Sequence, residues 1–367
     1  MPLTRSSIPG GRKLSTTLLL AATLIAALVV NQPAQAAEKS SFKVAWSIYV
    51  GWMPWDYADQ SGILKKWADK YGIKIELTQI NDYVESINQY TAGKFDGCVM
   101  TNMDTLTIPA AGGVDSTALI VGDYSNGNDG VVLKGAGKKL VDIKGQSVNL
   151  VELSVSHYLL ARGLASVGLA ERDIKVVNTS DADIVSAFAS PTVTSTVTWK
   201  PQLAEVTAVP KTTLVFDSSK IPGEILDLMV INSATLKDNP KLGKALVGAW
   251  YETLALMLGK DAKATAALEA MAKASGTDLA GFKGQLATTY LYSTPASAVA
   301  AAKSPDLVKK MDLVRKFSFD HGLLGEGAKT VDAVGIEFPG GATLGNKANL
   351  KMRFDPGFMQ LAADGKL

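Results

Sequence analysis

Aromatic side chains crowd one short stretch of the chain, where together they could form a ligand-binding wall. The stretch V-A-W-S-I-Y-V-G-W-M-P-W-D-Y-A over residues 44–58 starts as an apolar strand and ends where Pro54 and Asp56 open a helix. The aromatic residues between them are Tyr49, Trp52, Trp55 and Tyr57. Loops that follow strands are where open α/β sheets bind small molecules. Each ring alone could serve only to fasten the helix to the sheet, but the cluster as a whole predicts a ligand-facing wall.

Carboxylates recur at the other turns that follow predicted strands. They are Asp82, Asp104, Asp123, Glu152, Asp181, Asp183 and Glu224, with Lys200 as the main basic residue. Asp104 and Asp181 are also well placed as helix N-caps, which is a structural role. Glu152 precedes Ser154, the expected cap of the next helix, and should point into a cleft, while Glu224 should lie on a hinge. An anion would need arginine, lysine or bare helix N-termini, so this set predicts a small cation held by carboxylates and aromatic faces.

Residue types for catalysis and metal binding are scarce. The two histidines, His157 and His321, cannot form an H-E-x-x-H motif, and we expect no two-histidine metal site. The single cysteine, Cys98, lies in an apolar strand pattern and should be an inert core thiol. There is no G-x-S-x-G motif, and the G-A-G-K-K run at 135–139 lacks the Ser or Thr of a phosphate loop. We therefore expect no catalytic residue, no metal and no cofactor. The expected ligand contacts are Tyr49, Trp52, Trp55, Asp82, Met103, Asp104, Asp123, Glu152, Ser154, Trp199 and Glu224.

The order of the elements predicts an α/β fold that positions these residues. Apolar strand-like segments alternate with amphipathic helices after Ser41, which is the βαβ rhythm of a mostly parallel sheet. The rhythm restarts after Gly130, and residues 233–324 are nearly all helical in pattern. The expected strands are 42–48, 73–80, 95–101, 117–121, 131–134, 147–151, 175–178, 194–199, 213–216 and 225–232. The expected helices before residue 233 are 56–70, 84–91, 104–110, 182–189, and one that runs from Ser154 to near Gly168. The last 30 residues should be irregular and wrap the surface before a short terminal helix.

This order fits one lobe that is interrupted by a second. We expect lobe 1 to comprise 41–130 and 225–335, lobe 2 to comprise 131–224, and a C-terminal extension to cover 336–367. The chain would cross between the lobes near Gly130 and Gly223. The ligand would then lie between the lobes, where strand-end turns from both converge.

The first 36 residues have the pattern of a secretory signal peptide. A basic start is followed by an apolar stretch at 18–30 and by the small-x-small site A-Q-A at 34–36. The apolar stretch is too short for a comfortable transmembrane span. Without this segment the chain carries 34 basic and 35 acidic residues, so nothing in its charge suggests nucleic acid or an anionic membrane as a partner. We expect an exported, soluble protein.

Five segments carry a resemblance to a known family. They are W-S-I-Y-V-G-W-M-P-W-D-Y-A from Trp46, I-N-D-Y-V-E-S-I from Ile80, F-D-G-C-V-M-T-N-M-D from Phe95, N-L-V-E-L-S-V-S-H-Y from Asn149, and I-P-G-E-I from Ile221. With them the chain resembles the type II periplasmic solute-binding proteins of ABC importers, in the nitrate/sulfonate/taurine-type branch. Within that branch it is similar to the group associated with urea carboxylase gene regions. The resemblance covers residues 41–367. It implies a two-lobed fold with parallel-rich sheets and a helical C-terminal section, a periplasmic location, a small-molecule ligand, an inner-membrane ABC permease as partner, a monomer, and no enzymatic activity.

Three hypotheses for function remain at this point. The leading one is capture of a small nitrogen-rich solute, guanidinium, because similar carboxylases act on guanidine. The second is the same kind of protein with urea, nitrate, or a sulfonate such as taurine as its ligand. The third is an enzyme similar to thiamine-precursor synthases, against which the lone Cys98 and the signal peptide both count. The relatives mostly carry Asn where this chain has Lys200, so a Lys200 that faced the cleft would argue against a purely cationic ligand.

Overall fold

The computed structural model describes residues 39–367, and the signal peptide predicted over residues 1–36 lies outside the described residues. None of the helices between residues 39 and 367 combines the length and the apolar character that crossing a bilayer requires.

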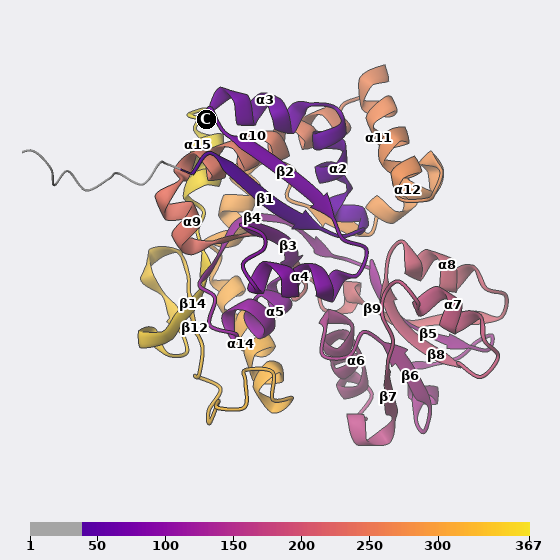
Figure 1. Ribbon diagram of the computed structural model, residues 1–367. Helices are drawn as coiled ribbons and strands as arrows, with labels where there is room; N and C mark the ends of the chain where they lie inside the picture. Colours follow the sequence, from indigo (N-terminus) through magenta and orange to yellow (C-terminus); the bar gives the residue numbers. More distant parts are fainter. Residues whose placement is uncertain (1–38) are drawn as a thin grey trace, which may run out of the picture. The chain divides into compact units, whose positions relative to one another are not determined.

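The strands of the described residues form two sheets (Figure 1). The large sheet contains β1 Ser41–Trp46, β2 Lys74–Gln79, β3 Gly97–Thr101, β4 Ser116–Ser125, β10 Leu226–Asn232, β11 Thr289–Leu291, β12 Gly335–Glu337, β13 Thr343–Leu344 and β14 Leu350–Phe354. The small sheet contains β5 Asp129–Lys134, β6 Ser147–Leu150, β7 Lys175–Asn178, β8 Ser195–Trp199 and β9 Thr212–Asp217. The order is β13-β12-β14-β4-β10-β3-β1-β2 in the large sheet, where β11 also pairs with β4, and β7-β6-β8-β5-β9 in the small sheet.

Both sheets mix parallel and antiparallel pairs. As the βαβ rhythm predicts, β1 is parallel to β2 and β3, and β6 is parallel to β7 and β8. In contrast, β10 is antiparallel to β3 and β4, and β5 is antiparallel to β8 and β9. These two strands are the first that the chain forms after it passes from one sheet to the other. The predicted α/β class is confirmed, and the antiparallel pairs are the part that the rhythm does not predict.

Helices cover the faces of both sheets. Their bounds are α2 Met53–Gln60, α3 Ile63–Lys70, α4 Tyr83–Thr91, α5 Asn102–Thr105, α6 Val155–Ser166, α7 Ile184–Ala189, α8 Gln202–Ala208, α9 Ser233–Asp238, α10 Pro240–Met257, α11 Ala262–Ala274, α12 Leu279–Leu286, α13 Pro295–Ala302, α14 Pro305–Asp320 and α15 Gly357–Ala363. Helices α3 and α10 pack together on one face of the large sheet, and α4 lies on the other face (Figure 1). A side chain at Gly248 of α10 would collide with the ring of Trp67, so the glycine permits this close approach.

Three sequence predictions differ from the structure. The predicted helix over 56–70 is two helices, because Gly62 adopts a φ of 79° and ends the first one. Strand β4 runs four residues beyond its predicted end and contains Asp123, which was expected in a turn. The last 30 residues are not irregular throughout, because β14 pairs with β4 and β12 pairs with β14. The predicted terminal helix is confirmed as α15.

The chain changes sheet twice. All strands between residues 129 and 217 belong to the small sheet, whereas those up to 125 and from 226 onward belong to the large sheet. The two passages therefore fall in the segments 126–128 and 218–225. The lobe boundaries given above stay a prediction.

Candidate functional site

A small cavity lies where elements of both sheets meet. Its lining residues are Tyr49, Trp52, Tyr83, Thr101, Asp129, Val155, Trp199, Ile225 and Asp227. They come from the turn after β1, the start of α4, the ends of β3 and β8, and the starts of β5, α6 and β10. The space open to the centres of water-sized molecules is about 20 Å³, little more than one water requires. The cavity therefore has room for about one water as it stands, and the smallest ligands would require the least widening.

Four aromatic rings follow one another around this cavity. Tyr49 meets Trp52 edge-on, with ring centroids 5.1 Å apart. The ring of Trp52 lies 5.6 Å from that of Tyr83, which in turn meets the edge of Trp199 at 5.5 Å. Three rings thus come from elements of the large sheet and one from β8 of the small sheet. Aromatic faces in this arrangement attract a cation through the ring quadrupole.

Two aspartates line the cavity and a third lies directly behind them. Asp129 and Asp227 are lining residues that are only 3% and 4% exposed. Asp227 stands opposite the buried Asp123 in the register of β10 and β4. The Tyr49 hydroxyl donates to Asp123 Oδ1 at 3.4 Å and accepts from Asn128 Nδ2 at 3.0 Å. Within the part of the chain that the structure describes, Asp227 Oδ2 and Asp123 Oδ2 have no hydrogen-bond partner.

Burial raises the pKa of these three carboxyl groups, so protons stay on them up to near neutral pH. It raises the pKa of Asp123 to about 7 and that of Asp129 to about 7. The pKa of Asp227 lies well above its usual range because of burial and then because of the neighbouring Asp123. Two buried carboxyl groups this close cannot both ionise without a large cost, so one of this pair keeps a proton. A cation in the cavity would stabilise the ionised forms and take the place of a proton.

Asp104 lies behind the cavity wall and orders it. Its Oδ2 accepts from the Tyr83 hydroxyl and from Thr101 Oγ1, each at 2.7 Å, and the backbone N–H of Val155 also donates to this carboxylate. Burial raises the pKa of Asp104 to about 6. Asp104 lies in α5, which follows β3 of the large sheet, and Val155 begins α6, which follows β6 of the small sheet. The contact therefore links elements of the two sheets.

No basic side chain balances these carboxylates at the cavity. Among the described residues that line it, none is Lys, Arg or His. Lys200 does not line the cavity. Its Nζ donates to Thr288 Oγ1 at 2.8 Å, and the residue lines a separate hollow together with Asp217. Lys200 therefore offers no charge to a ligand in the cavity.

Other hollows are larger but lack this chemistry. One of about 470 Å³ lies beside Tyr124, Tyr290 and Tyr292. Its charged lining residues, Asp306 and Lys310, neutralise each other at 2.7 Å. A cavity with buried carboxylates that have no basic partner is the stronger candidate for a ligand site.

The structure gathers about half of the predicted contacts at the cavity. Tyr49, Trp52 and Trp199 line it, and Asp104 and Asp123 each lie one contact behind the lining. The other predicted residues lie elsewhere.

Trp55, Met103 and Ser154 do not line the cavity. Trp55 is buried in the core and stacks on Trp250 with ring centroids 5.0 Å apart. Met103 is also buried, at 1% exposure. Ser154 is the N-cap of α6, as predicted, and accepts from the backbone N–H of Ser156.

The predicted acidic contacts Asp82, Glu152 and Glu224 also lie outside the cavity. Asp82 and Glu152 line a different hollow at the surface, and Asp82 caps α4 by accepting from the N–H of Glu85 at 2.9 Å. Glu224 accepts from Arg162 at 2.8 and 3.0 Å and from the Tyr158 hydroxyl. The carboxylate of Glu224 is thus committed to an ion pair inside the protein.

Four further polar lining residues were not among the predicted contacts: Tyr83, Thr101, Asp129 and Asp227. Asp227 carried a signal, because an ionisable residue inside the apolar run L-D-L-M-V-I-N is costly unless it has a use. Asp129 carried a weaker one, as the residue directly before the apolar strand G-V-V-L.

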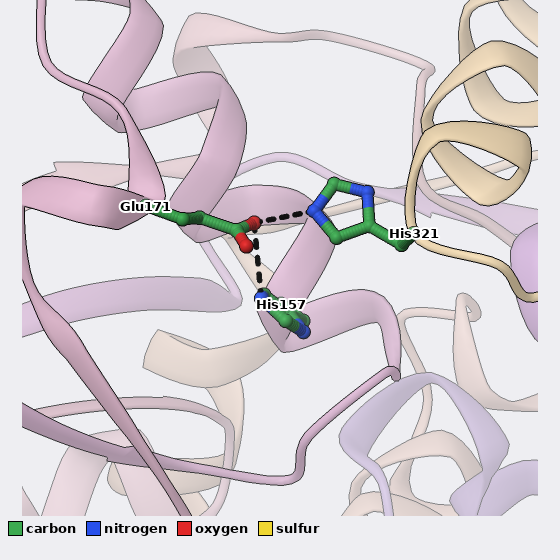
Figure 2. Close-up of side chains that lie close together, drawn as sticks. All are labelled: His157, Glu171 and His321. Atoms are coloured by element: carbon green, nitrogen blue, oxygen red, sulfur yellow. Dashed lines mark hydrogen bonds and ion pairs between the residues drawn. The ribbon is translucent and has the colours of Figure 1, made fainter.

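The structure also brings the two histidines together, which their separation in the sequence does not predict. Both histidines of the chain meet Glu171, although His157 and His321 are far apart in the sequence (Figure 2). Donor atoms of the three side chains lie within 4.8 Å of one another. Sequence spacing alone could not exclude a two-histidine site, since tertiary contact brings the residues together.

Comparisons with known proteins identify the family and the fold. Residues 35–272 match the model of the NMT1-like family. No curated protein matches the chain. Among solved structures, the alkanesulfonate-binding protein SsuA from Xanthomonas axonopodis pv. citri, bound to MOPS, has a TM-score of 0.66 at 19% identity, over 81% of this chain and 99% of that one.

Two further solved structures give the same result. The periplasmic aliphatic sulphonate binding protein SsuA from Escherichia coli has a TM-score of 0.65 at 16% identity, over 78% of this chain and 94% of that one. The periplasmic nitrate-binding protein NrtA from Synechocystis PCC 6803 has a TM-score of 0.55 at 13% identity, over 90% and 99%. At such identities these matches show the fold, and they confirm the predicted type II periplasmic-binding-protein fold.

Proposed function

The chain belongs to the NMT1-like family, and we propose that it is the exported, non-enzymatic solute-binding component of an ABC importer that captures guanidinium. The ligand would occupy the cavity between Trp52 and Trp199 and would be delivered to a permease in the inner membrane. This class of function is supported by the fold, which periplasmic sulfonate- and nitrate-binding proteins share.

One observation carries the choice of a cation. Asp129 and Asp227 are buried in an aromatic cavity whose described lining residues include no basic side chain. No basic side chain there could pair with an anion, whereas a planar cation would stabilise the ionised carboxylates and gain from the ring faces as well. The N–H groups of guanidinium would also satisfy Asp227 Oδ2, which lacks a partner within residues 39–367.

Ligand size agrees with this choice. Very small ligands gain at most about 1.5 kcal/mol per non-hydrogen atom, so the four atoms of guanidinium allow ~6 kcal/mol, a dissociation constant of roughly tens of micromolar. Fully desolvated ion pairs can exceed that ceiling. Taurine has seven such atoms and would require the cavity to widen more than guanidinium would.

Urea is the second candidate, and one atom favours it. The indole Nε1 of Trp52, at the cavity wall, is a buried donor without a partner among the described residues. Urea has a carbonyl oxygen that could accept from this N–H, whereas guanidinium has no acceptor. Nitrate and sulfonates such as taurine remain alternatives because proteins that bind sulfonates and nitrate share the fold.

Isothermal titration calorimetry with guanidine, urea, nitrate and taurine tests the proposal. We expect saturable binding of guanidine with one ligand per chain and no heat of binding with nitrate or taurine. Tight binding of nitrate or taurine without a response to guanidine would overturn the cation assignment. Binding of urea alone would move the assignment to the neutral ligand and would leave the cavity in place.

A further inference from the structure

The side chains of His157, Glu171 and His321 converge on one point away from the solute cavity (Figure 2). His157 lies in the first turn of α6, Glu171 begins the short helix η4 Glu171–Asp173, and His321 is the C-cap of α14. Glu171 Oε1 lies 3.0 Å from His157 Nε2 and 2.6 Å from His321 Nε2. The carboxylate of Glu171 thus links η4 to α6, both between the strands of the small sheet in the sequence, and to α14, which follows β11 of the large sheet.

We propose that this cluster is a binding site for Zn²⁺, with His157 Nε2, His321 Nε2 and a Glu171 oxygen as its protein ligands. Two imidazoles and one carboxylate are a donor set that zinc accepts with a further position left for water. Hard cations such as Mg²⁺ prefer sites made of oxygen alone. Donors at about 2.0–2.2 Å from one ion lie roughly 3–3.5 Å apart. Glu171 Oε1 is already near that spacing from each imidazole nitrogen, and the two nitrogens lie within 4.8 Å of each other.

The environment of two ligands prepares them for a metal. His321 Nδ1 contacts the carbonyl oxygen of Phe317 at 2.8 Å and Nε2 contacts Glu171 Oε1 at 2.6 Å, so each ring nitrogen faces an acceptor and donates a proton to it. Zinc would displace the proton on Nε2 and leave Nδ1–H on Phe317. A second ring nitrogen that donates to a backbone carbonyl is the usual arrangement of metal-bound histidine. Glu171 Oε1 faces the Nε2 atom of both histidines, so a single carboxylate oxygen lies between the two imidazole donors.

Access and burial also suit an ion that binds from solvent. The side chains of His321 and Glu171 are 20% and 32% exposed, whereas His157 is 3% exposed and forms the floor of the site. An ion can therefore enter past His321 and Glu171.

His157 must adjust when the ion binds. Its Nδ1 accepts the backbone N–H of Leu153 at 3.1 Å, which places the ring proton on Nε2. Coordination through Nε2 moves that proton to Nδ1 and opens the bond to Leu153. Leu153 adopts a φ of 63° two residues before Val155, which lines the solute cavity. We therefore expect zinc to bind more weakly than at a closed structural site, and to alter solute affinity.

The test is a zinc titration of the chain without a histidine tag, in competition with a chromophoric chelator. We expect one Zn²⁺ per chain, no response to Mg²⁺, and affinity that is weaker by roughly tenfold or more in His321→Gln and in Glu171→Gln. Glu205→Gln, which removes an exposed charge of the same kind on α8, should bind zinc like the parent. Circular dichroism of each variant checks that it is folded.

X-ray absorption of the zinc-loaded chain gives an independent readout. The chain has two histidines in all, so a spectrum with two imidazole ligands identifies the site without any variant. Absence of saturable zinc binding overturns the proposal and leaves a proton-sharing cluster. Binding that survives in folded His321→Gln overturns it as well, because the ion would then lie elsewhere.

Discussion

Asp227 combines two properties that seldom meet in one side chain: it lines a ligand cavity and it lies inside a hydrophobic strand. The strand places it opposite Asp123, so a pair of carboxyl groups is held together by main-chain pairing rather than by a flexible loop. Such a pair is costly in the empty protein and favourable once a cation arrives. The same carboxyl groups therefore destabilise the empty protein and would bind the cation.

The first prediction follows from this pairing. Asp227→Asn should abolish measurable guanidinium binding, since an incompletely paired buried cation loses roughly 3–5 kcal/mol. The same change should leave the unliganded protein at least as stable, because the amide removes a carboxyl group that burial penalises. Calorimetry and thermal unfolding of the variant measure the two effects.

Asp238→Asn is the matched control for that experiment, since Asp238 is exposed on α9. It should match the parent in both measurements. A lower melting temperature together with unchanged affinity for guanidinium in Asp227→Asn would contradict the prediction.

The second prediction concerns pH. The folded protein holds protons on Asp123 and Asp129 up to about pH 7, whereas unfolded aspartate releases them near pH 4. Stability from these groups is therefore full below about pH 4 and is lost as the pH rises toward 7. A cation competes with the same protons, so its affinity should increase over that range.

Thermal shift assays between pH 5 and 8, with and without guanidinium, measure both trends. We expect the shift caused by guanidinium to grow with pH, and its binding to release protons in calorimetry carried out in different buffers. A shift that is constant or that shrinks as the pH rises would contradict a site with protonated carboxyl groups.

At the scale of elements, Gly51 is what lets the turn after β1 approach β4. A Cβ atom at this position would lie 2.6 Å from Asp123 Oδ2 and 2.6 Å from Tyr49 Cε1. The absence of a side chain thus allows the aromatic turn and the buried carboxylate to touch. This approach explains why a glycine stands among bulky residues there.

The third prediction is that Gly51→Ala weakens guanidinium binding at least tenfold by displacing Asp123 and Tyr49 from their contact, with a stability loss of about 1–3 kcal/mol from overpacking. Gly284→Ala in α12 is the control, because a Cβ atom there meets no atom within 4 Å. Unchanged affinity in Gly51→Ala would mean that the Tyr49–Asp123 contact does not shape the cavity.

Elements were predicted well where the pattern is local. The strand at 175–178 and the Ser154 cap were found because apolar runs and capping residues act within a few positions. The extension of β4 through Asp123 was missed, since polar residues in sequence imply a turn and only the facing strand β10 makes burial possible. The antiparallel placement of β5 and β10 is likewise a tertiary property.

The candidate site was predicted on its aromatic side more than on its acidic side. Tyr49 and Trp52 follow a strand and Trp199 ends one, so the rule that ligands bind at strand ends predicts all three. The same rule predicts Glu152 and Glu224, which lie elsewhere. A carboxylate beside a turn can cap a helix, form an ion pair or bind a ligand, and the sequence does not show that Glu224 pairs with Arg162. Tertiary partners decide which acid remains for a ligand.

At the scale of the whole molecule, contacts between the two sheets' elements gather around the cavity. Tyr83 N donates to Asp181 Oδ1 at 3.3 Å, and the ring of Tyr83 meets that of Trp199. Asp181 belongs to the small-sheet part of the chain and Tyr83 to the large-sheet part. These contacts close the cavity, so they should govern how long a ligand stays.

The last prediction tests this with Asp181→Ala, which removes a closing contact without altering a residue that lines the cavity. Guanidinium should dissociate several-fold faster while its association rate changes little, because affinity falls in proportion to the population of the closed form. Stopped-flow tryptophan fluorescence can follow both rates, since Trp52 and Trp199 line the cavity. Asp238→Asn again serves as the control. If dissociation is as slow in Asp181→Ala as in the parent, closure does not depend on the Tyr83–Asp181 contact, and residence time must be set by the carboxylates and rings within the cavity itself.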